Sequence, residues 1–95
     1  MKISLRKYKM HPALLEYIGT TVFLSSIAFV GTPIVIAGTL FAVIFVLGKL
    51  TGGHVNPAVT LWALLSGKIG QSKAILYVAA QLAAAVTVYL LKTRV

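Results

Sequence analysis

The chain has 95 residues, 59% of them hydrophobic, and nine basic residues against a single acid give it a formal net charge of +8. It is too short for more than one domain and too apolar for a water-soluble one, so a membrane protein is indicated. One acid, two histidines and no cysteine exclude disulfides and thiolate metal sites. They leave little for a catalytic or metal site, so we expect no enzyme activity, no metal and no cofactor.

The basic residues lie mostly at the ends of hydrophobic segments, and no basic face interleaved with aromatic residues is evident. Such positions are typical of membrane topology signals and of contacts with lipid headgroups, so nucleic-acid binding is not expected. Residues 1–10 form a basic leader that we expect on the cytoplasmic side. It carries Lys2, Arg6, Lys7 and Lys9.

The first predicted span covers residues 13–30, close to the ~20 apolar residues that a membrane crossing needs. The span contains Glu16, and a charge inside a membrane is costly unless it is paired. A basic leader followed by an apolar run also fits a secretory signal, with a small-residue cleavage site at 26–28. The acid inside the apolar run and the further apolar segments downstream argue against its removal.

After a turn at 31–33, a second span is predicted at 34–49 and a third at 73–91, with a polar segment at 66–73 between them. If the N-terminus is inside, Lys2, Arg6, Lys7, Lys9, Lys49, Lys68 and Lys73 lie inside, and Lys92 and Arg94 lie outside. This seven-to-two bias predicts a cytoplasmic N-terminus and an external C-terminus. We expect an integral protein of the plasma membrane.

Residues 51–66 read as an extended run that turns abruptly into a short helix. Asn56 is a strong N-cap residue and Pro57 suits the first helical position, so a helix should run from there to about Ser66. At 1.5 Å per residue this helix is roughly 15 Å long, half the hydrocarbon thickness of a bilayer. It can enter a membrane but cannot cross it. The predicted fold class is therefore all-α, with three membrane-spanning helices and one re-entrant half-helix.

The stretch from Gly52 to Thr60, Gly-Gly-His-Val-Asn-Pro-Ala-Val-Thr, closely resembles the first signature loop of the aquaporin family, the major intrinsic proteins. Two further matches support this. Glu16 with Gly19-Thr20 is similar to the Glu-x-x-Gly-Thr of the family's first helix, and Tyr77 with Gln81 is similar to its third. The resemblance covers nearly the whole of residues 1–95, yet it matches only the first half of a family member.

The resemblance implies a channel in which two inverted halves meet and their short helices touch at the membrane centre. The signature residues would be Asn56, Pro57 and Ala58, with the Asn56 amide facing the pore. The implied pore lining consists of Gly52, Gly53, His54, Val55, Asn56 and, from the second helix, Ile36. Glu16 is expected to accept hydrogen bonds from the loop backbone, and Gln81 to do the same from the third helix.

Two departures from the family pattern bear on the solute. The family's narrowest constriction, its filter, normally combines an aromatic or other residue of the second helix with an Arg that follows the second Asn-Pro-Ala. Here the second-helix residue is Ile36, which is smaller than an aromatic ring. Val59 follows Pro57-Ala58, so this half supplies no filter arginine. A pore made of two such halves would be wider, admitting glycerol or other small neutral solutes besides water. The Gly-Gly-His form is nonetheless more similar to the water-channel branch.

Several alternatives stay open. Asn56 could serve only as a helix cap, and His54 only as a packed, hydrogen-bonded side chain. The chain could pair with an inverted copy of itself, pair with a separate second half or be an excerpt of a longer protein, and the family resemblance implies a larger oligomer. It could also be a non-conducting membrane scaffold, or a truncated remnant that needs a partner. A basic membrane-surface anchor acting through the leader is a third class.

Overall fold

A computed structural model describes residues 10–95, and in this range the chain is all-helical, as predicted. Its helices are α2 (Pro12–Phe29), α3 (Pro33–Leu47), α4 (Pro57–Leu65) and α5 (Gln71–Thr93). The basic leader, with Lys2, Arg6, Lys7 and Lys9, lies outside the described residues. Two of the helices, α2 and α5, are long and apolar enough to cross a membrane, whereas α3 has 15 residues. The count of three spans therefore stays a prediction.

Three of the four helices begin at a proline, because its fixed φ suits the first helical position, where its missing N–H has no intrahelical partner. His11 caps α2 by accepting a hydrogen bond at Nδ1 from the Ala13 N–H, at 2.9 Å. Asn56 caps α4 in the same way. The helix starts are thus local properties of the sequence.

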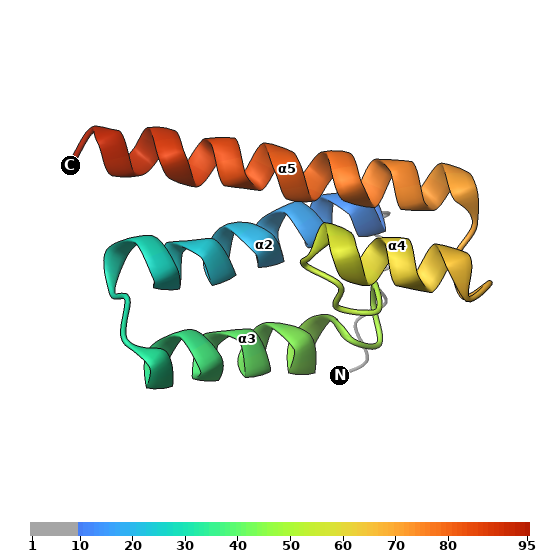
Figure 1. The fold of residues 1–95 in the computed structure, drawn as a ribbon, viewed down its shortest axis with the longest axis horizontal. Coiled ribbons are helices and arrows are strands. Elements are labelled where there is room, and N and C mark those ends of the chain that lie inside the picture. Colours follow the sequence, from blue (N-terminus) through green and yellow to red (C-terminus); the bar gives the residue numbers. More distant parts are fainter. Residues whose placement is uncertain (1–9) are drawn as a thin grey trace.

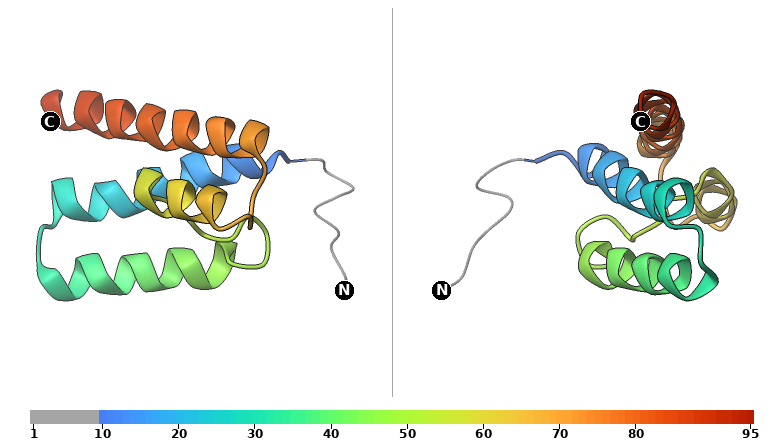
Figure 2. Two further views of the ribbon diagram at one scale, coloured as in Figure 1. Left: turned by 45° about the vertical axis from the view of Figure 1, so that its right-hand side comes forward. Right: turned by 90° about the vertical axis from the view of Figure 1, so that its left-hand side faces the viewer.

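Helix α2 lies in the middle of the molecule, with α3 on one side and α5 on the other (Figure 1). The short helix α4 lies beside α5, and the end-on view shows the four helices in a compact cluster (Figure 2). Helical hydrogen bonding continues past α3, since Thr51 N–H donates to the Leu47 carbonyl and Gly52 N–H to the Gly48 carbonyl. The hydrogen-bonded run of 33–52 is roughly 30 Å long, close to a bilayer core.

The buried and exposed side chains are distributed unlike those of a soluble protein. The largest fully buried side chains are polar: Tyr77, Gln81, Glu16 and Thr60. Large apolar side chains are exposed on every helix, and Phe41 and Phe45 of α3 are 70% and 77% exposed. Such apolar surface is stable only when lipid or another protein covers it.

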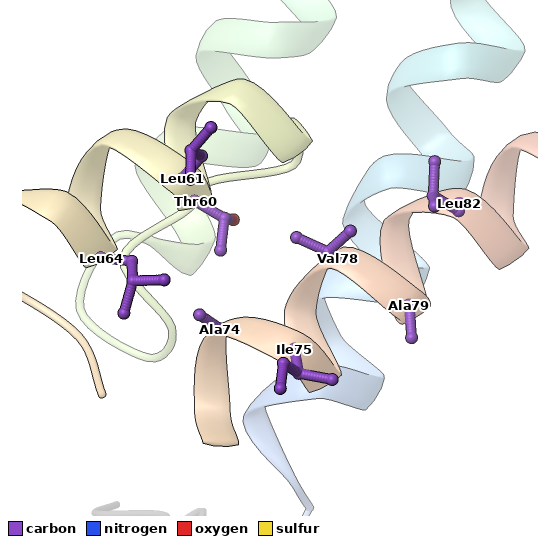
Figure 3. A pocket seen from close by; sticks show the side chains of 8 residues that line it. All are labelled: Thr60, Leu61, Leu64, Ala74, Ile75, Val78, Ala79 and Leu82. Carbon is purple, nitrogen blue, oxygen red and sulfur yellow. The ribbon is translucent and has the colours of Figure 1, made fainter. Parts of the chain in front are cut away.

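An open apolar groove of about 410 Å³ separates α4 from α5 on one side of their contact. Leu61 and Leu64 of α4 and Ile75 and Val78 of α5 are among the residues that line it (Figure 3). The groove forms part of the apolar surface that needs covering.

Gly19 lets α2 approach α3 closely. A Cβ atom at this position would lie 2.5 Å from Leu47 Cδ1 and 3.1 Å from both Val43 Cγ1 and Val55 Cγ1. Val43, Leu47 and Val55 form a small apolar core at this helix contact. Any side chain at position 19 would therefore displace that core.

We predict that Gly19→Val lowers the free energy of unfolding in detergent by about 1 to 3 kcal/mol, because the added carbons overpack this core. Thermal unfolding followed by circular dichroism measures the change. Gly38→Val is the matched control, since a Cβ at position 38 would meet nothing within 4 Å. Equal melting temperatures for the two variants would contradict the packing described here.

Candidate functional site

The loop between α3 and α4 has an unusual backbone. Gly52 and Gly53 have φ of 96° and 61°, which glycine adopts readily, but Val55 has φ of 43°. A β-branched residue in this region is strained, at a typical cost of about 1–3 kcal/mol. Other contacts must therefore hold Val55 in place.

The carboxylate of Glu16 holds this loop. It accepts hydrogen bonds from the backbone N–H groups of His54, at 3.0 Å, and Val55, at 2.7 Å. It also accepts from the Thr51 hydroxyl, at 2.7 Å, and from Gln81 Nε2, at 3.0 Å. Glu16 is fully buried, and its two oxygens accept two hydrogen bonds each. This arrangement offsets the cost of burying the only acidic side chain.

Thr51 fastens the start of the loop to α5. Its hydroxyl accepts a hydrogen bond from the Gly53 N–H, at 2.9 Å, and its carbonyl accepts one from the Tyr77 hydroxyl, at 2.7 Å. Gly53 lies against α3, since a Cβ there would be 3.3 Å from Ile44 Cα. The loop is therefore held by α2, α3 and α5 together.

Gln81 supports the site indirectly. Its Nε2 donates to Glu16 and, at 2.9 Å, to the hydroxyl of Thr60 in α4, and it makes no bond to the loop backbone within residues 10–95. The same hydroxyl pairs with His54 Nδ1, at 2.9 Å. The ring of His54 also packs edge-on against Tyr77, with centroids 5.1 Å apart. His54 is thus half-buried and hydrogen-bonded, and it also lines a cavity of about 520 Å³.

The signature residues lie at the start of α4. The side-chain oxygen of Asn56 accepts a hydrogen bond from the Ala58 N–H, at 2.8 Å, so Asn56 does act as a cap. Its side chain is exposed, and its amide nitrogen makes no hydrogen bond within residues 10–95. No donor in that range bonds the carbonyl oxygens of Gly52, Gly53, His54 or Val55. The free amide nitrogen of Asn56, a hydrogen-bond donor, therefore follows four free carbonyl acceptors along the chain.

Ile36 lies apart from this cluster. It is half-buried in the second turn of α3, eight residues before the point where Gly53 meets Ile44. Eight helical residues span roughly 12 Å, so the structure does not bring Ile36 to the loop.

Sequence reasoning assigned no role to Thr51, Thr60 and Tyr77, although all three are buried hydrogen-bonding partners of the site. A signal was present, because Tyr77 and Gln81 are four residues apart and so share one face of a helix. Thr60 is likewise four residues after Asn56. In the described part of the chain, no three His, Cys, Asp or Glu side chains group as a metal site would require.

Buried polar anchors beneath exposed apolar helices are characteristic of an integral membrane protein, and comparison with known sequences identifies which kind. The sequence profile described as "Major intrinsic protein" matches residues 7–94. The chain therefore belongs to the major intrinsic protein family.

The relatives of the chain include aquaporins. The chain is 52% identical to aquaporin-5 of Mus musculus over 40 residues, which cover 42% of this chain and 15% of that protein. It is 54% identical to aquaporin TIP3-2 of Zea mays over 43 residues, covering 45% and 16%. It is 48% identical to probable aquaporin TIP3-2 of Arabidopsis thaliana over 52 residues, covering 55% and 20%. The matched stretches thus span at most a fifth of these relatives, and no solved structure matches the chain.

We predict that Glu16→Gln loosens the loop, because an amide offers one acceptor oxygen where the carboxylate offers two. Each buried donor left without an acceptor costs about 1–3 kcal/mol. Hydrogen exchange read by mass spectrometry should show faster exchange across 52–56.

The matched control is Tyr17→Phe, which removes a 2.6 Å bond between Tyr17 and Thr87 that joins α2 to α5 away from the loop. Its loop should exchange at the wild-type rate. If Glu16→Gln also left exchange of the loop unchanged, the carboxylate would not be its anchor.

Proposed function

We propose that this chain supplies half of a membrane pore that conducts water. The observation that carries the proposal is the conformation of the loop, which leaves the Asn56 amide nitrogen free at the start of a half-length helix. Four free carbonyls precede it, on a backbone fixed from three sides by buried contacts. Membership of the major intrinsic protein family and the likeness to aquaporins support the same reading.

The groups match what a water molecule needs in a narrow passage. The carbonyls of Gly52 to Val55 accept hydrogen bonds from water and replace part of its lost hydration, and the Asn56 amide donates to its oxygen. The N-terminus of α4 adds the positive end of its helix dipole at the same point. Water reorients as it passes, whereas cations and protons meet an electrostatic barrier.

A half needs a complement. Helix α4 has nine residues and is roughly 14 Å long, so it reaches only about halfway across a bilayer. In an inverted-repeat channel a second half-helix enters from the other side, and the two meet at the midplane. The complement is either an inverted copy of this chain or a separate second half, within a larger oligomer. It would also cover part of the exposed apolar surface.

The residues that this half contributes to the pore lining determine which solutes the pore conducts. Ile36 lines the pore on the outer side of Asn56, and Val59 stands in place of a filter arginine. A pore of two identical halves therefore passes glycerol and other small neutral solutes besides water. With a second half that carries an arginine, it is restricted to water.

The chain lies in the plasma membrane. Its N-terminus is in the cytoplasm, as the distribution of basic residues favours. The polar segment 66–73 then lies on the cytoplasmic side, and the start of the loop opens to the same side.

The proposal is tested by osmotic shrinkage of vesicles reconstituted with the chain, followed by stopped-flow light scattering. If the complement is an inverted copy of the chain, water flow above that of empty vesicles is expected, with a low activation energy. Asn56→Asp should reduce this flow severalfold and admit cations, because it places a charge at the constriction. Aspartate caps helices as well as asparagine does, so α4 should persist.

Gln71→Glu is the control, because it adds the same charge at an exposed position outside the loop. It should leave water flow unchanged. Flow that is indifferent to Asn56→Asp would contradict the pore assignment. No excess flow, with insertion verified, would exclude a self-sufficient pore and favour the non-conducting scaffold, unless a separate second half restored flow.

Chemical labelling distinguishes the two complements, an inverted copy of the chain and a separate second half. The chain has no cysteine, so Ser72→Cys gives a single thiol in the first turn of α5. In intact cells we expect an impermeant maleimide to reach this thiol only after permeabilisation, as the charge bias requires. Labelling of a large share from outside would instead show that part of the chain inserts in the inverted orientation, which pairing with a copy of itself requires.

A further inference from the structure

Two lysines line the cavity beside the loop, and water conduction gives them no role. The cavity of about 520 Å³ beside the loop has Gly52 and His54 of the loop and two lysines, Lys68 and Lys73, among its lining residues. It shares no lining residue with the apolar groove, and its lining is part polar and part apolar.

Both ammonium groups rest on aromatic rings. Lys68 Nζ lies 5.7 Å from the ring centroid of Trp62, and Lys73 Nζ lies 5.7 Å from that of Tyr77. Tyr77 is fully buried and packs against His54, so the position of Lys73 is tied to the loop itself. Cation–π contacts of this kind stabilise a charge only weakly, by about 0.5–1 kcal/mol at exposed sites.

No carboxylate is available to neutralise these two charges. Glu16 is the only acidic side chain, and its four hydrogen-bond donors are all uncharged groups. Both ammonium groups line one cavity, so an anion that enters it is attracted by two positive charges. The cavity is therefore suited to an anion with several acceptor oxygens.

We propose that this cavity binds a phosphate group, held between Lys68 and Lys73. Phosphate carries up to two negative charges and accepts hydrogen bonds at several oxygens, so it can bridge two ammonium groups at once. Two sources share this chemistry: a free phosphate ion, and the headgroup of an anionic phospholipid, which the position of segment 66–73 between membrane helices makes accessible.

Trp62 reports on the cavity directly, because it is the only tryptophan of the chain and it lines the same space. A phosphate that draws Lys68 away from the indole should change the tryptophan fluorescence. The chain is reconstituted in phosphatidylcholine vesicles and titrated with inorganic phosphate, or reconstituted with increasing phosphatidic acid in phosphate-free buffer. Broadening of the phosphorus NMR signal gives a second reading that does not depend on the indole.

A saturable response in either arm is expected, and the arm that responds identifies the source. Lys68→Gln and Lys73→Gln should each weaken binding about tenfold, which corresponds to 1.4 kcal/mol. Lys92→Gln is the control, because it removes the same charge from a lysine that lies over Phe29 instead, 5.1 Å from its ring. It should leave both signals unchanged.

The proposal is overturned if both readings stay flat in both arms. It is also overturned if the response survives in the double variant Lys68→Gln, Lys73→Gln, or if Lys92→Gln weakens it equally, since the attraction would then be a general effect of net charge. None of these readings depends on water flow, so failure of the pore assignment would leave this test intact.

Discussion

The carboxylate of Glu16 is the interaction on which the rest of the structure depends. It lies in the middle helix, and its four hydrogen bonds reach the loop backbone, Thr51 and Gln81. Without these bonds, Val55 would leave its strained conformation, with φ of 43°. The positions of the loop carbonyls and of Asn56 depend on that buried charge, together with the contacts of Thr51 and Gly53.

The buried Glu16 carboxylate, with its uncharged hydrogen-bond donors, is also the centre of an unusual distribution of side chains. The largest fully buried side chains are polar, and many large apolar side chains are exposed, so hydrogen bonds hold much of the centre together. The apolar core between α2 and α3 is small, with Val43, Leu47 and Val55, and Gly19 lets α2 approach it closely. The loop and the core share Val55, which couples the site to the stability of the fold.

Local patterns in the sequence predicted the helices, because proline starts and apolar runs are properties of neighbouring residues. The sequence also singled out Glu16 as a charge that needs a partner, and Asn56 as a cap. The contacts of Thr60 and Tyr77 escaped prediction, since they join residues that are 6 to 26 positions apart in sequence and meet only after folding. For the same reason Gln81 was expected to bond the loop backbone but instead bonds Glu16 and Thr60. The pore lining at Ile36 stays a prediction.

The central claim is that Glu16 touches the loop backbone, and solid-state NMR of the chain in lipid bilayers tests it most directly. Glu16 is the only glutamate and there are two histidines, so ¹³C at its carboxyl carbon and ¹⁵N at the histidine backbone give few signals. We expect clear dipolar dephasing between the two labels, because the His54 nitrogen lies 3.0 Å from Oε2. An absence of dephasing would contradict the anchor, and with it the account of how the loop is held.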